Sequence, residues 1–247
     1  MPIIHRALVL GCVICVFASS ASAALVDWGT LSWAAGSLSN SYDVDPANAG
    51  NDVTVTVGGD TAQLQQSLAA GNPLTPAITR AFDGGLGTSP HTLELALDLT
   101  SNAQSVTFTI FDIDANNISG STYQDVISGI HATSTTGTQI APTITNVGAN
   151  VSLTGTGLSQ VLTGQSSTVD TGAGSGAANA TISFNTNGIA SITFTYGSSG
   201  LFADPTYQHI GIYNLDYTVV PEPGGLGACV VIASLAALKA HRRRETR

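Results

Sequence analysis

The sequence predicts an all-β protein, an antiparallel β-sandwich of jelly-roll type, and three observations lead to this prediction. Apolar and polar residues alternate with period two, most clearly over 93–99, where leucine occupies every second position. Clusters of Gly and Asn, such as Gly84-Gly85 and Asn116-Asn117, separate the alternating runs and are typical of turns. Thr, Val and Ile are frequent, and these β-branched residues favour strands. The predicted sandwich covers residues 24–219.

The remaining strands follow from the same alternation. Asn187-Gly188 separates two alternating runs and predicts a hairpin turn. One helix is predicted over 61–70, ended by Gly71. The other runs that predict strands are 53–57, 106–110, 126–132, 139–147, 151–154, 161–169, 182–184, 192–196 and 210–219.

Charge is scarce and unevenly distributed. Between Ala24 and Val220 the chain has fourteen acidic residues and a single basic one, Arg80, which gives a net charge of −13 with His neutral. Such a body repels nucleic-acid phosphates and anionic lipid and attracts divalent cations. The same segment has no cysteine, so it has neither disulfides nor a cysteine metal site.

The N-terminus predicts a signal peptide over 1–23. Arg6 supplies a positive charge, an apolar run follows over 7–18, and small residues at Ala21 and Ala23 fit signal-peptidase cleavage before Ala24. The apolar run is too short to span a membrane. The alternatives are a buried N-terminal helix and a lipoprotein acylated at Cys12 or Cys15.

The C-terminus combines three features in order over 220–247. The motif Val220-Pro221-Glu222-Pro223 ends the last strand, because proline cannot donate to a sheet ladder. Residues 224–238 carry no charge and predict a single membrane-spanning helix of about 22 Å, which is short for a hydrocarbon core of about 30 Å. The basic tail 239–247 is expected to stay cytoplasmic.

This order of motif, apolar helix and basic cluster resembles the PEP-CTERM sorting signal. The resemblance implies recognition by an exosortase after export by the signal-peptidase route, in a Gram-negative bacterium that makes exopolysaccharide. It implies a final location in the envelope, at the outer surface or in the extracellular matrix. Two features depart from the family: Gly224-Gly225 follows the motif, and Ala240-His241 interrupts the basic run. The alternative is a plain membrane anchor that is not removed.

One acidic cluster is a candidate metal site. Asp112 and Asp114 follow the strand at 106–110 with the same parity, and Asp125 lies beyond a short polar loop. Carboxylates with loop carbonyls suit Ca²⁺. The stretch 108–114 also resembles an F-x-I-x-D-I-D element of secreted β-sandwich proteins, which include other PEP-CTERM members. The alternative is that these residues cap a turn by hydrogen-bonding to their own backbone.

No catalytic residue is identified. His91, His131 and His209 are scattered and do not predict zinc, and no G-x-S-x-G motif is present. Trp28 and Trp33 would stack on sugar or pack the first strand into the core. We therefore expect a non-enzymatic surface or matrix protein associated with exopolysaccharide. The alternatives are a calcium-dependent carbohydrate-binding module and, third, a glycoside hydrolase, which the scarcity of aromatics disfavours.

Overall fold

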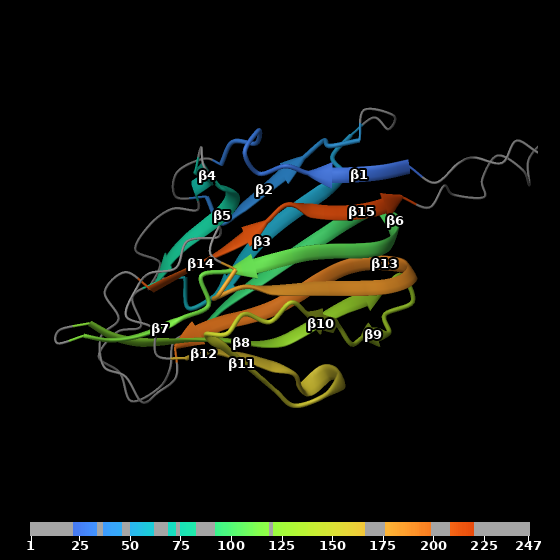
Figure 1. Cartoon of the computed structure of the whole chain (residues 1–247). Coiled ribbons are helices and arrows are strands. Elements are labelled where there is room, and N and C mark those ends of the chain that lie inside the picture. The colour runs from blue at the N-terminus through green and yellow to red at the C-terminus, as the bar shows by residue number, and fades with distance from the viewer. Residues whose placement is uncertain are drawn as a thin grey trace, which may run out of the picture. The chain divides into compact units, whose positions relative to one another are not determined.

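The protein folds into one curled antiparallel sheet, seen in a computed structural model (Figure 1). The structure describes residues 22–33, 37–45, 50–61, 69–72, 75–82, 92–118, 121–165, 176–198 and 208–219. The strands are β1 (Ser22–Val26), β2 (Ser39–Tyr42), β3 (Val53–Gly59), β4 (Ala69–Asn72), β5 (Thr75–Phe82), β6 (Thr92–Phe111), β7 (Ala115–Ile118), β8 (Ser121–Ser134), β9 (Gln139–Ile140), β10 (Thr143–Thr145), β11 (Val151–Thr154), β12 (Val161–Gly164), β13 (Ala180–Ser198), β14 (Gln208–Tyr213) and β15 (Leu215–Val219), with a short 3-10 turn η2 (Gly157–Ser159).

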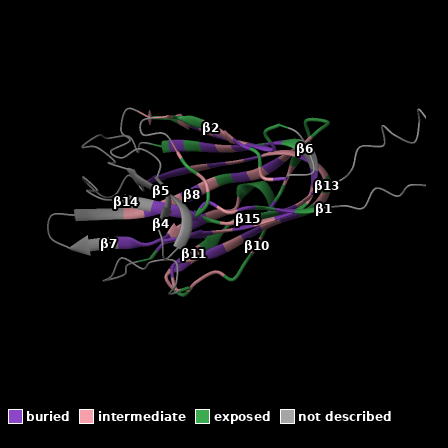
Figure 2. Cartoon of the chain, turned by 90° about the horizontal axis from the view of Figure 1, so that it is seen from above, coloured by how far each residue is buried: buried purple, intermediate pink, exposed green. Residues whose placement is uncertain are grey.

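Two long strands organise the sheet. β6 and β13 pair antiparallel along nearly their whole lengths, from Ala180 opposite Ile110 to Gly197 opposite Thr92. Their alternation of buried and solvent-facing residues follows the period-two pattern of the sequence, and Figure 2 shows this alternation along the strands. The all-β, antiparallel part of the prediction is confirmed.

The β6–β13 ribbon folds over on itself. Its register shifts three times between Phe184 and Ser191. Phe108 and Phe194 are stacked with ring centroids 6.5 Å apart. Phe194 pairs with Leu95, which lies about 43 Å from Phe108 along a straight strand at about 3.3 Å per residue. The ribbon must therefore bend so that its two halves face each other across the core.

The neighbouring strands divide between these two halves. β3 and β2 extend the sheet from the first half of β6, and β8 pairs with the second half of β13. β15 and β1 extend it from the second half of β6, and β10 pairs with the first half of β13. β14, β5 and β4 continue from the end of β6. β7, β9 and β12 pair with β8, and β11 pairs with β12.

The core lies between the two halves and consists of aliphatic and aromatic side chains. Among the described residues, the largest side chains with less than 2% exposure are Trp28, Tyr196, Phe108, Phe184, Phe194, Leu93, Leu95, Leu97 and Ile110. Burial of this apolar surface is the main favourable term for folding, because the body has no disulfides.

One local prediction is wrong, and a second is contradicted at its end. Asn187 and Gly188 do not turn the chain; they lie inside β13, where Asn187 pairs with Gln104 and Gly188 has a φ of 76°. The positive φ that suits a hairpin also suits an irregularity within a strand, and here both flanks pair with β6. The predicted helix 61–70 ends in a strand, because Ala69 and Ala70 belong to β4. Residues 62–68 lie outside the described part of the chain.

The predicted membrane helix 224–238 and most of the predicted signal peptide also lie outside the described residues. Within the residues that the structure describes, none of the helical segments has the length and hydrophobicity needed to cross a membrane.

Candidate functional site: two acidic clusters

The predicted cluster lies where the chain leaves β6. Asp112, Asp114 and Asp125 are all buried, with exposures of 2%, 2% and 0%. β6 ends at Phe111, and Asp112 has a left-handed backbone with a φ of 63°. The sequence argument assumed that Asp112 and Asp114 continue the alternation of the strand, but the strand ends before Asp112. Asp is one of the few residues that adopt this conformation readily.

The Asp125 carboxylate connects two parts of the protein by hydrogen bonds: the segment that follows β6, and the strand β13. Its Oδ2 accepts a hydrogen bond of 3.0 Å from the Asp114 amide, and the Asp125 amide donates one of 2.9 Å to the Asp114 carbonyl. Its Oδ1 accepts one of 2.9 Å from the Tyr196 hydroxyl. Hydrogen bonds to a buried carboxylate offset much of the cost of removing its charge from water.

Close backbone packing surrounds this cluster. A Cβ added to Gly164 of β12 would collide with the Asp114 carbonyl, and Gln124 donates a hydrogen bond of 2.9 Å to the Gly164 carbonyl. Ile113 is fully buried, and its amide donates to the Ala178 carbonyl at 2.9 Å. Across the described residues, no group of three or more His, Cys, Asp or Glu is placed to hold a metal ion. Calcium at this cluster stays a prediction, while the hydrogen bonds favour the turn interpretation.

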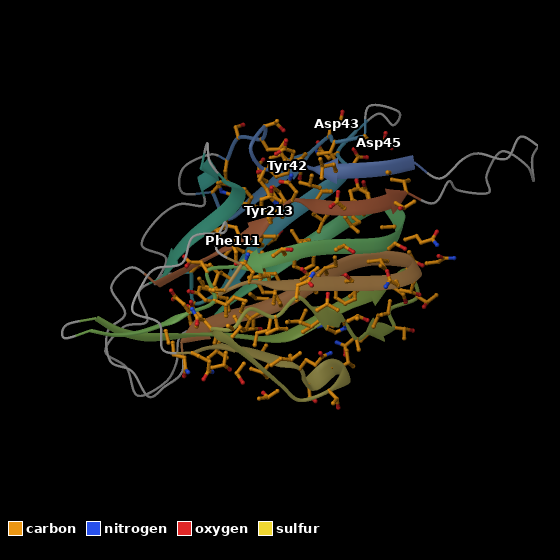
Figure 3. The ribbon with its side chains drawn as sticks, viewed as in Figure 1. Tyr42, Asp43, Asp45, Phe111 and Tyr213 are labelled. Carbon is orange, nitrogen blue, oxygen red and sulfur yellow. The ribbon has the colours of Figure 1, made fainter. Side chains whose placement is uncertain are left out.

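The sequence did not predict a second acidic cluster before β3. Asp45 and Asp52 are both buried, with exposures of 5% and 4%. Asp52 Oδ2 accepts two hydrogen bonds, from the Val44 amide at 2.8 Å and the Asp45 amide at 2.7 Å. Asp43 is exposed beside them. Figure 3 shows Asp43 and Asp45 on the side of the body where β1 lies.

Tyr217 lies on β15, which pairs with the second half of β6. It is 2% exposed, and its hydroxyl has no hydrogen-bond partner among the described residues. Burial raises the pKa of Tyr217 well above its usual 10.0, and the negative charges of Asp52 and Asp45 raise it further. The phenol therefore stays protonated and lies within electrostatic reach of both carboxylates.

The acidic residues of this cluster could be identified from the sequence, but Tyr217 could not be connected with them. The spacing of Asp43, Asp45 and Asp52 around a Gly-containing loop is visible in the sequence. Tyr217 could not be assigned to it, because the pairing of β15 with β6 and β1 is a long-range feature that alternation alone does not specify.

The aromatic residues at the start of the body are structural. Trp28 is fully buried, and its Nε1 donates to the Tyr213 carbonyl at 3.3 Å. Trp33 donates to the Ser37 carbonyl at 2.9 Å and lies 6.3 Å from the Tyr42 ring. For Trp28 the interpretation that the side chain packs into the core is confirmed, because a fully buried ring cannot stack on a sugar. His131 hydrogen-bonds to the Gly129 carbonyl at 2.7 Å in an exposed position.

The strand that contains the predicted signal-peptide cleavage site pairs with the last described strand of the body. In the β1–β15 ladder Ser22 lies opposite Val219, Ala23 opposite Thr218 and Ala24 opposite Tyr217. Cleavage before Ala24 would remove Ser22 and Ala23 from β1. Ala21 and the motif residues Val220, Pro221, Glu222 and Pro223 lie outside the described residues.

Comparison with known proteins finds no matching family model, no matching curated protein and no matching solved structure.

Proposed function

We propose that the chain is an exported, tail-sorted surface or matrix protein that associates with exopolysaccharide and is not an enzyme. The observation that carries this proposal is the β1–β15 pairing, with Ser22 opposite Val219. Both ends of the folded body leave it at the same edge.

The outer faces of the sheet support a polysaccharide partner. Hydroxyl side chains pair across neighbouring strands in both halves: Ser41 with Thr54 at 2.8 Å, and Thr107 with Ser183 at 3.2 Å. Such rows offer donors and acceptors to sugar hydroxyls over an extended surface. Tyr213 is the one exposed large aromatic among the described side chains, which favours a broad polar contact over a defined sugar-stacking site.

The finer architecture belongs to the same proposal. We assign the folded-over ribbon and its two sets of flanking strands to a jelly-roll-like β-sandwich. A signal peptide precedes this sandwich, and a PEP-CTERM-like tail with one membrane helix follows it. Signal peptidase and an exosortase are the processing partners. The location is the envelope or matrix of a Gram-negative bacterium.

Processing is tested by mass spectrometry of the protein from its native host. The expected product begins at Ala24, because Ala21 and Ala23 fit the peptidase, and ends near Pro221–Pro223. Mature protein that retains Arg247 would support the plain-anchor alternative instead. Retention of residues 1–18 would contradict export by signal peptidase.

Polysaccharide association is tested by co-sedimentation with the host's own exopolysaccharide. The mature protein should sediment with the polymer, and a variant with Thr54→Val and Thr56→Val should sediment less, since both hydroxyls lie on the outer face of β3. Val retains the shape and strand preference of Thr. Equal sedimentation with and without polymer would contradict the proposal, whereas glycan cleavage would support the hydrolase alternative.

A calcium-dependent carbohydrate-binding module is the second candidate. The observation that favours it is the presence of two clusters of buried carboxylates in a body with one basic residue. It is distinguished from the first proposal by polysaccharide binding that is lost in EDTA and restored by calcium.

A further inference from the structure

We propose that the outer edge of β11 is an interface at which two copies of this chain pair, strand to strand, into a dimer with twofold symmetry. β11 ends one side of the sheet: within the described part of the chain it pairs with β12 and with no other strand. Figure 1 shows it along the lower rim of the body. A strand edge of this kind offers backbone donors and acceptors to a further strand.

The ladder between β11 and β12 determines which backbone groups of β11 point outward. The Gln165 amide donates to the Asn150 carbonyl at 2.6 Å, so this carbonyl faces β12. In an antiparallel ladder the direction alternates from residue to residue, so the amide and carbonyl of Leu153 face away from β12. The Val151 amide follows the same alternation, because it donates to the Gly148 carbonyl at 3.0 Å, outside the ladder. Leu153 is therefore the residue through which a further strand would bond.

The Leu153 side chain lies on the core side of the sheet but is only partly covered. It is opposite Leu162, whose exposure is 0%, and it shares a face with Val151, whose exposure is 8%. Leu153 itself is 36% exposed, and Leu158, on the η2 turn between β11 and β12, is 46% exposed. A strand added at β11 would cover apolar surface that the described chain leaves open, and this burial favours association.

The distribution of charge identifies a second copy as the partner. The body has a net charge of −13, so two copies repel each other wherever their acidic residues approach. No Asp, Glu, Lys or Arg occurs over 126–169, the stretch that contains β11, β12 and most of β8. Two β11 edges can therefore meet without bringing like charges together. The same stretch offers no formal charge that would attract a strongly acidic or basic partner.

The edges at β1 and β2 have a different character. β1 is followed by Asp27, and its exposed Leu25 lies opposite Asp216 of β15. β2 is followed directly by the exposed Asp43. Charged residues at edge strands prevent pairing between molecules. β11 lacks this protection, which makes it the edge best suited to self-association.

The twofold axis is expected to pass beside Leu153. Antiparallel pairing of a strand with its own copy is self-complementary, and Leu153 opposite its counterpart would give two reciprocal backbone hydrogen bonds. Gly155, with a φ of 74°, follows the end of β11, so the shared ladder is short. We therefore expect a reversible dimer. It would present two copies of any polysaccharide-binding surface and so bind a long polymer more tightly than the monomer does.

The first test is sedimentation velocity of the full-length chain in mild detergent at increasing protein concentration. At about 0.15 M salt, where the screening length is about 8 Å, wild type should show a monomer–dimer equilibrium, and the dimer should weaken at about 0.01 M salt as repulsion between the bodies grows. Leu153→Lys places like charges opposite each other and should raise the dimer Kd about a hundredfold. The matched control is Leu25→Lys, which puts the same charge on the exposed edge strand β1 and should dimerise as wild type does.

Disulfide cross-linking tests the register and covers the case in which Leu153→Lys does not fold. The parent chain has Cys12, Cys15 and Cys229 replaced by Ser; all three lie outside the described residues. Leu153→Cys should give a covalent dimer under mild oxidation, because facing Cα atoms about 5.5 Å apart suit a disulfide. Thr154→Cys, also exposed, is offset from its counterpart by two residues and should remain largely monomeric, because its Cα atoms would be more than about 7 Å apart.

Several results would overturn this assignment. They are a wild-type chain that stays monomeric at every concentration, a Leu153→Lys variant that dimerises like wild type, a Leu25→Lys variant that dissociates as Leu153→Lys does, and equal disulfide yields at positions 153 and 154. The inference is independent of polysaccharide binding, so failure of the sedimentation experiment with exopolysaccharide would leave it intact.

Discussion

The two acidic clusters contain the same side chain in similar burial, yet they have different surroundings. Asp125 is enclosed by donors: the Asp114 amide on one oxygen and the Tyr196 hydroxyl on the other. The negative charges of Asp52 and Asp45 raise the pKa of Tyr217, whose hydroxyl has no hydrogen-bond partner among the described residues. Each cluster therefore acts on a buried tyrosine, and a hydrogen bond to a carboxylate is formed only by Tyr196.

This difference concerns the two tyrosine hydroxyls, of which one has its hydrogen-bond acceptor in place and the other has none among the described residues. A buried polar group with its partners in place stabilises a unique arrangement of the chain, whereas a buried group without one costs free energy until a ligand supplies it. Clustering of acidic residues is thus insufficient to identify a metal site.

The largest expected effect is that of Asp125→Ala. The substitution leaves the Tyr196 hydroxyl and the Asp114 amide buried without their acceptor, and each such group costs about 1–3 kcal/mol. We expect the free energy of unfolding in urea to fall by about 4 kcal/mol. Asp125→Asn, which keeps an acceptor oxygen, should lose less. A loss below about 1 kcal/mol would show that this carboxylate does not organise the chain.

The next effect compares the two tyrosines in EDTA. Tyr196→Phe removes a hydrogen bond to a buried carboxylate and should lower the free energy of unfolding by about 2 kcal/mol. Tyr217→Phe removes a hydroxyl that has no partner among the described residues, and should leave stability unchanged or raise it by up to about 1 kcal/mol. Equal losses in chemical denaturation would remove the distinction between the clusters.

A smaller effect concerns alkaline pH. Tyr217 has a pKa raised above 10.0 in the folded state, first by burial and then by Asp52 and Asp45. Below pH 10.0 the phenol is neutral in both states, and above it the unfolded chain ionises first. Stability should therefore decrease as the pH rises past 10.0, by about 1.4 kcal/mol per unit from this residue.

The control for the alkaline effect is Tyr217→Phe, whose stability should depend less steeply on pH above 10.0. Tyr42, whose pKa burial also raises, contributes to both proteins and cancels in the comparison. Identical pH profiles of wild type and variant, measured by urea unfolding at each pH, would contradict the burial of a neutral phenol at this position.

Much of the sheet could be predicted from alternation, whereas its connections could not. The runs 93–99 and 106–110 are two halves of one strand, β6, in which Ser105 has a φ of 55°. Asn187-Gly188 has the composition of a turn but lies within β13. Local composition reports which backbone angles are available. The pairing partners decide whether those angles reverse the chain or bend it.

The candidate sites show the same limit. Asp112, Asp114 and Asp125 were identified as a group because they are near in sequence, but their roles depend on Tyr196 of β13. Asp45 and Asp52 were visible in the sequence, whereas the effect of their charges on Tyr217, on the last strand, was not. Period-two patterns indicate which residues face the core and give no information on which buried residues from distant strands will meet there.

The most direct test is a pair of double-mutant cycles in urea unfolding, one with Asp125→Asn and Tyr196→Phe and the other with Asp52→Asn and Tyr217→Phe. The first cycle should give a coupling energy of about 1–2 kcal/mol, because the Tyr196 hydroxyl donates to the Asp125 carboxylate. The second cycle should be additive to within about 0.5 kcal/mol, because the Tyr217 hydroxyl has no hydrogen-bond partner among the described residues. Equal coupling energies in the two cycles would contradict the distinction between the two tyrosines.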